Sequence, residues 1–203
     1  MQLTYRAPVR GRRLVIAALP LAAGLAVLGG PPSVVPAGLE AGEAQARPCP
    51  SPKANPGTIG PAQASRTVAC LINRRRAHRG LPILKQRAAL RDTARRHSER
   101  MVNRGCFAHL CPGEKPLVTR VRQETSYLPC KCKFRLAQTI GGGANARGRP
   151  IRIVRNWIRT KRNRKVLFSR KFRHVGVGVV WGGPGAPGND SFGTYTAIFG
   201  YKR

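Results

Sequence analysis

The segment GCFAHLC, residues 105–111, places one histidine between two cysteines, and all three side chains can do chemistry. Two thiolates and an imidazole are typical ligands of zinc, whereas two thiols in an oxidising compartment form a disulfide. Cys130 and Cys132 offer a second close pair of thiols. The chemistry of these residues therefore depends on the compartment in which the chain works.

The first 46 residues have the features of a signal peptide. Four arginines precede an uncharged apolar run over residues 14–28, and Ala44-Gln45-Ala46 matches the small-x-small pattern that a signal peptidase cleaves. The alternative is a membrane anchor, but an apolar run of about 15 residues is short of the roughly 20 that a spanning helix needs. We therefore expect a secreted or cell-wall-associated protein, cleaved after Ala46 or, alternatively, near Ala37.

Such a cleavage leaves all six cysteines of the chain in place: Cys49, Cys70, Cys106, Cys111, Cys130 and Cys132. An even number of cysteines in an exported chain favours disulfides. Cys49 lies in a proline-rich lead-in over residues 47–65, and we expect it to pair with Cys70. That bond attaches the irregular lead-in to the rest of the domain.

The remaining four cysteines form a C-x4-C and a C-x-C pair. Cys130 and Cys132, on a strand-like segment, project to the same face and cannot easily reach each other. We therefore expect each of them to pair with Cys106 or Cys111, which joins the His109 loop to the following segment. The alternative is a zinc site of four thiolates, or of three thiolates and His109, although its spacing matches no common zinc module.

The net charge is extreme, with 38 Lys and Arg against seven Asp and Glu, a formal +31. The leader holds four of the basic and two of the acidic residues, so the rest carries 34 against five, or +29. Such a surface binds polyanions without sequence preference, which predicts no specific nucleic-acid recognition. Since the basic residues are scattered through every segment, charge alone names no partner.

Hydrophobic periodicity predicts the secondary structure of residues 66–203. We expect helices over 66–79, 85–104, 116–124 and 150–160, a strand over 134–140 that runs into a triple-glycine turn, and strands over 174–181 and 194–202. His97 lies on the apolar stripe of the second helix, which favours a hydrogen-bonded core residue over a catalyst. Helices combined with a few antiparallel strands predict a layered domain.

The order of four segments resembles the CAP superfamily of cysteine-rich secretory and pathogenesis-related proteins, and most of all its SCP-like bacterial secreted branch. The segments are CLINRRRAHRGLPIL, ALRDTARRHSERMVNRGCFAHLCPG, WIRTKRNRKVLFSRKFRHVGVGVVWG and TYTAIFG. The resemblance implies an α+β fold, a three-layer α-β-α sandwich with a small antiparallel sheet, over residues 66–203.

The resemblance also implies a central cavity, lined in many members by two histidines and two acidic residues that in some members bind zinc. The histidine of the family's F-x-H loop falls on His109, and the second histidine falls on Asn163. The two acidic positions fall on Gln138 and Thr160. His97 matches a histidine typical of the bacterial branch.

This chain therefore has the family's residue type at one of the four cavity positions, His109. Glutamine and asparagine amides are poor ligands for transition metals, so we expect no metal and no cofactor. No acidic residue close in sequence is placed to orient His97 or His109, because Glu99 points off the apolar face and only Glu114 lies near otherwise. We expect no catalytic residue; a hydrolase using His109 and His97, or a zinc-binding secreted protein, is the alternative.

Together these features predict a monomeric, disulfide-stapled binding module without enzymatic activity. Its expected partners are anionic polymers or lipids of the cell envelope, since some members of the family carry sterols or fatty acids. A structural wall protein with no specific ligand is a further alternative, in which binding shows no preference beyond charge.

Overall fold

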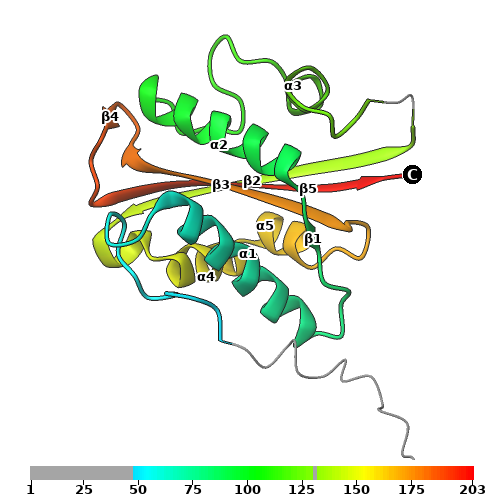
Figure 1. The fold of residues 1–203 in the computed structure, drawn as a ribbon, viewed down its shortest axis with the longest axis horizontal. Helices are drawn as coiled ribbons and strands as arrows, with labels where there is room; N and C mark the ends of the chain where they lie inside the picture. Colours follow the sequence, from blue (N-terminus) through cyan, green and yellow to red (C-terminus); the bar gives the residue numbers. More distant parts are fainter. Residues whose placement is uncertain (1–47, 130–131) are drawn as a thin grey trace, which may run out of the picture. The chain divides into compact units, whose positions relative to one another are not determined.

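A sheet lies between two layers of helices in the computed structural model, which describes residues 48–129 and 132–203 (Figure 1). The predicted signal peptide and Cys130 lie outside the described residues. The described residues fall within one compact unit, which contains both hydrophobic cores, so we expect this part to fold on its own. None of the described helices combines the length and apolarity that a membrane crossing requires.

The helices and strands follow the predicted order, with additions. The helices are α1 (Pro61–Ala77), α2 (Ala88–Asn103), α3 (Leu117–Glu124), the 3-10 turn η2 (Asn145–Gly148), α4 (Pro150–Arg159) and α5 (Lys161–Leu167). The strands are β1 (Lys85–Gln86), β2 (Phe134–Ala144), β3 (His174–Gly183), β4 (Ala186–Pro187) and β5 (Phe192–Lys202). The α+β class and the three layers are confirmed.

The sheet has the order β1-β3-β5-β2, and β4 pairs with β3. β3, β5 and β2 are antiparallel, whereas the short β1 pairs in parallel with β3. Helices α2 and α3 cover one face of the sheet, and α1, α4 and α5 cover the other (Figure 1). β2 is an edge strand, so one side of it is free to line a site.

Three sequence predictions differ from the structure. α1 begins at Pro61, within the predicted lead-in, because a proline fits the first turn of a helix. The glycines at 141–143 do not turn but continue β2, paired with β5 from Tyr195 to Gly193. α5 was not predicted, because KRNRKVL buries only Leu167 and so has no apolar periodicity.

Two glycines of β3 set the distance between the sheet and α2. A Cβ atom at Gly176 would lie 2.1 Å from the backbone nitrogen of Arg91, and one at Gly178 would lie 2.0 Å from that of Arg95. The valines between and beside them point to the opposite face, where they join the core with α1. The alternation in GVGVV therefore brings the α2 backbone into direct contact with the sheet.

Cys49 pairs with Cys70, as expected, with 5.7 Å between their Cα atoms. Cys49 is itself buried against α1, so the bond attaches the lead-in to the core. In the chain-entropy account, closing this loop contributes about 3 kcal/mol to the free energy of unfolding.

The double substitution Cys49→Ala/Cys70→Ala is expected to lower the free energy of unfolding by about 3 kcal/mol, because the unfolded chain regains the entropy of the open loop. Urea denaturation measures this difference. With both proteins under reductant, which opens the remaining disulfides in each, the difference between them should disappear. A variant as stable as the parent protein would contradict the stapling role of this bond.

Candidate functional site

The carboxylate of Glu114 is the centre of a buried cluster of charged side chains. Its Oε1 lies 2.8 Å from Nδ1 of His97, 3.0 Å from Nη1 of Arg120 and 3.1 Å from Nη1 of Arg100. Its Oε2 accepts a hydrogen bond from the backbone N–H of Cys111 at 3.1 Å. The side chains of His97, Glu114 and Arg120 are 0%, 1% and 0% exposed, so water does not screen the contacts among these three.

Three elements bring this cluster together. His97 lies on the buried face of α2, as its position on the apolar stripe predicted. Arg120 lies on α3, one turn after Leu117 and beside the buried Val121. Glu114 comes from the loop between the two helices, 17 residues after His97.

The expectation that no acidic residue orients His97 was wrong. The loop after α2 folds back over that helix and places Glu114 against the imidazole. Gly105 and Gly113, both in the left-handed region with φ of 64° and 70°, allow the reversals of this loop. The loop has no hydrophobic periodicity, so the sequence held no signal for this contact.

Burial alone would raise the pKa of Glu114, but it is outweighed. The hydrogen bonds from the Cys111 backbone and His97, together with the charge of Arg120, hold the pKa of this carboxyl below its ordinary value. Glu114 is therefore a buried anion, and its charge is balanced by the two arginines around it.

The cluster holds the backbone of the 105–111 loop. Nε2 of His97 lies 3.1 Å from the carbonyl oxygen of Ala108. The carbonyl oxygen of His109 accepts hydrogen bonds from Arg120 at 3.4 Å and from the Gln138 amide at 3.2 Å. Gln138 also accepts a hydrogen bond from Arg120 at 3.0 Å, so both ends of its amide are engaged by protein groups.

The same loop is closed by a disulfide between Cys106 and Cys111, whose Cα atoms are 5.8 Å apart. The expected cross-pairing with the 130/132 couple is therefore wrong. The turn between Cys106 and Cys111 brings their backbones within disulfide range, which their spacing in the sequence did not reveal. Cys132 is also disulfide-bonded.

The structure brings three of the five family-matched positions, His97, His109 and Gln138, together. His97 lies close enough to His109 to contribute to the lowered pKa of that imidazole, and Gln138 contacts the His109 backbone. Thr160 and Asn163 lie at the junction of α4 and α5, where the Thr160 hydroxyl donates to the carbonyl of Asn156.

The environment of His109 is positively charged. Its partial burial lowers the pKa of the imidazole, and the charges of Arg162, His97 and Arg120 lower it further. His109 is therefore neutral at neutral pH. Arg162, next to the position of the family's second histidine, supplies this charge from α5.

These residues do not fit a zinc site. A divalent cation at His109 would face the guanidinium groups of Arg120 and Arg162, and the Gln138 oxygen is already taken by Arg120. Within residues 48–129 and 132–203, no group of three or more His, Cys, Asp or Glu side chains is arranged to hold a metal ion. His97 is fully buried with both nitrogens engaged, so it cannot serve a substrate as a general base.

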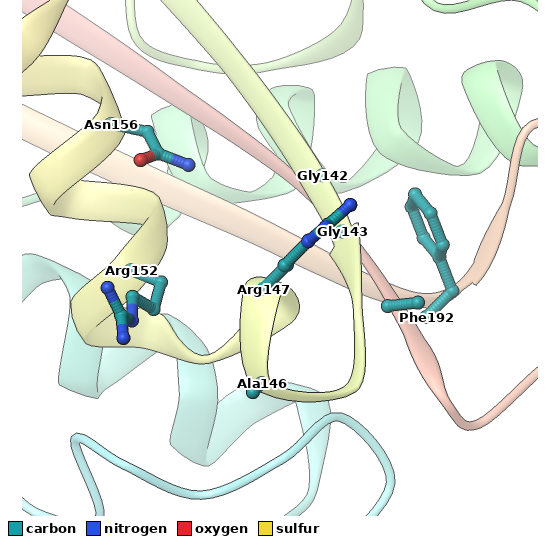
Figure 2. A pocket seen from close by; sticks show the side chains of 8 residues that line it. Gly142, Gly143, Ala146, Arg147, Arg152, Asn156 and Phe192 are labelled. Atoms are coloured by element: carbon teal, nitrogen blue, oxygen red, sulfur yellow. The ribbon is translucent and has the colours of Figure 1, made fainter.

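An open pocket of about 670 Å³ lies at the C-terminal end of β2 (Figure 2). Its lining residues are Gly142, Gly143, Ala144, Ala146, Arg147, Arg152, Asn156 and Phe192. Arg147 projects from η2, and Arg152 and Asn156 project from α4 (Figure 2). Two guanidinium groups, one amide and one aromatic ring suit an anionic ligand with an apolar part.

The pocket and the 105–111 loop are neighbours. A Cβ atom at Gly142 would lie 3.1 Å from Cε2 of Phe107 and 3.0 Å from Cε1 of Phe192, so both rings stand over this glycine. The sequence identified neither Phe107 nor the pocket arginines as site residues. The triple glycine was a signal, because small residues are typical where a backbone lies directly under other groups.

Acidic residues are distributed very unevenly between the two helical layers. The elements α1, α4 and α5 contain none. Their exposed basic residues form what we call the cationic face: Arg66, Arg74, Arg75, Arg152, Arg155, Arg159, Lys161, Arg162, Arg164 and Lys165. All seven ion pairs found within the described residues lie instead among α2, α3 and the loop between them. The positive charge of the cationic face is thus unneutralised.

Comparison with known families matches residues 70–192 to the cysteine-rich secretory protein family, CAP. Among solved structures, the fold is similar to an outer surface protein of Borrelia burgdorferi, with a TM-score of 0.59, 13% identity, and coverage of 71% of this chain and 97% of that one. It is also similar to an extracellular protein with an SCP domain from Bacillus anthracis, with a TM-score of 0.52, 20% identity, and coverage of 70% and 43%. No curated protein sequence matches the chain.

Proposed function

Because this chain belongs to the cysteine-rich secretory protein (CAP) family, we propose that it is an exported, non-enzymatic member that binds anionic polymers or lipids of the cell envelope. The cationic face carries the proposal. Ten exposed basic residues on one helical layer, without an acidic residue among them, create a positive potential that attracts a polyanionic surface.

The state of the cavity positions supports a binding role. The Gln138 amide hydrogen-bonds to the loop backbone and to Arg120, so it is not available to a ligand. His97 is buried against Glu114. The two structural relatives are an outer surface protein and an extracellular protein, which is consistent with work outside the cell. The apolar leader and the two disulfides closed within the described residues agree with export.

Neutralising the cationic face is expected to weaken binding far more than neutralising an equal charge elsewhere. Each basic residue near an anionic surface contributes about 1 kcal/mol, so the fourfold variant R152Q/R155Q/R159Q/R162Q should bind phosphatidylglycerol vesicles and isolated wall teichoic acid at least about a hundredfold more weakly. Co-sedimentation of residues 47–203 with each partner measures the change.

The matched control is R87Q/R91Q/K115Q/R122Q, which removes the same charge from exposed positions around α2 and α3. We expect this variant to lose less than about tenfold in affinity. Equal losses in the two variants would show that only total charge matters, which is the behaviour of a wall protein with no specific binding face.

A further inference from the structure

Three large apolar side chains are exposed in the described part of the chain, and two of them share one loop. Phe107 is 46% exposed and Leu110 is 49% exposed, and both lie inside the Cys106–Cys111 disulfide. The third, Ile83, is 56% exposed and lies in the turn between α1 and β1. Exposed apolar groups gathered on one small loop are typical of an interaction site.

The structure fixes the direction of these side chains. The carbonyl oxygens of Ala108 and His109 point inward, to His97 and to Arg120 and Gln138. The backbone N–H of Cys111 is also held from inside, by the buried carboxylate of Glu114. Since the space beneath the loop is filled by charged and polar groups, Phe107 and Leu110 have no apolar core to enter.

Positive charge lies beside this apolar tip. The Phe107 ring stands over Gly142, and Gly142 is one of the residues that line the pocket together with Arg147 and Arg152. His109 lies between Phe107 and Leu110 in the sequence. Arg162 is close enough to His109 to lower the pKa of its imidazole. The acidic group nearest in sequence, Glu114, is buried and paired, so it does not repel an anionic surface.

We propose that the Cys106–Cys111 loop inserts Phe107 and Leu110 into the interface of an anionic lipid bilayer, while Arg147, Arg152 and Arg162 contact the headgroup phosphates. A rigid apolar tip beside cationic groups combines the two signals that stable membrane attachment requires. The inference rests on the proposed function and deepens it, because it selects lipid over a wall polymer as the partner of this surface.

The test is the double substitution Phe107→Ser/Leu110→Ser in residues 47–203, with Ile83→Ser as the matched control for an exposed apolar residue. Half-burial of a phenylalanine and a leucine is expected to strengthen binding to phosphatidylglycerol vesicles at least about tenfold, so the loop variant should lose that factor. The Ile83 variant should bind as the parent protein does. Binding of soluble teichoic acid should be the same for all three proteins.

A loop variant that binds vesicles as tightly as the parent protein would overturn the insertion and leave the charge-based function standing. A parent protein that binds neither vesicles nor teichoic acid would overturn the proposed function itself. Thermal melts of each variant show whether a loss of binding reflects a loss of fold.

A second measurement keeps the proposal testable if the loop variant is unstable. Phe107→Trp should show a blue-shifted fluorescence on addition of phosphatidylglycerol vesicles and quenching by brominated acyl chains, whereas Ile83→Trp should show neither. An unchanged emission of the Phe107→Trp protein on bound vesicles would overturn the insertion.

Discussion

Replacing Glu114 with glutamine is expected to lower the free energy of unfolding by about 3–5 kcal/mol, among the largest effects of any single substitution in this protein. The carboxylate balances Arg120, whose side chain is 0% exposed and whose Nε has no hydrogen-bond partner among the described residues. A glutamine amide keeps the shape but removes the charge, so it leaves the buried guanidinium of Arg120 without its ion-pair partner. Chemical denaturation of both proteins measures the difference.

The control for this prediction is Glu99→Gln. Glu99 pairs with Arg95 on the exposed face of α2, where an ion pair contributes no more than about 1 kcal/mol. A loss from Glu114→Gln as small as that from Glu99→Gln would contradict the role of the buried cluster.

The pH dependence of stability provides an independent readout of the same carboxylate. The pKa of Glu114 is lower in the folded protein than its ordinary value of 4.5, so the unfolded chain binds its proton more readily. The stabilisation is therefore complete above pH 4.5 and is lost as the pH falls through the folded pKa. The Glu114→Gln protein should lack this component, and identical pH profiles would contradict the assignment.

Replacing Gly178 with alanine is expected to be comparably damaging, with a loss of about 3 kcal/mol or more in the free energy of unfolding. The added methyl group would lie 2.0 Å from the backbone nitrogen of Arg95 and 2.3 Å from the carbonyl carbon of Ala94. Backbone atoms in a helix cannot move aside singly, so α2 as a whole must leave the sheet. His97 moves with that helix, so the 105–111 loop loses its support too.

Gly60→Ala is the matched control, because its backbone has φ of −66° and no atom lies within 4 Å of the added methyl group. Since Gly60 is the N-cap of α1, where alanine is less favourable than glycine, that substitution should cost no more than about 1 kcal/mol, and urea denaturation compares the two variants. A Gly178→Ala protein as stable as the parent would contradict the direct contact between α2 and β3.

The sequence predicted the layers well, because they follow from local patterns. The apolar stripe of α2 correctly placed His97 in the core, and the hydrophobic periodicity of residues 174–181 correctly predicted β3. Both predictions need only the helical or strand period of one segment. The predicted start of α1 and the predicted end of β2 were less accurate. A proline can lie in the first turn of a helix, and a triple glycine can lie within a strand, as well as between such elements.

The site was harder to predict because chain reversals build it. Glu114 reaches His97 through a loop without periodicity, and Cys106 reaches Cys111 through a turn that their spacing does not reveal. Arg120 follows the apolar stripe of α3, three residues after Leu117, but a charged residue on such a stripe does not reveal its buried partner. Sequence reasoning therefore found the histidines and missed the anion that holds one of them.

Cationic membrane binding is tested best by measuring the binding of residues 47–203 to phosphatidylglycerol and to phosphatidylcholine vesicles over a series of salt concentrations. We expect binding to phosphatidylglycerol alone, with most of it lost between about 0.05 M and 0.5 M salt as the charges are screened. A residual fraction should resist high salt, because the Cys106–Cys111 loop contributes apolar contacts. Equal binding to both lipids, or no binding to either at low salt, would contradict a cationic membrane-binding CAP domain.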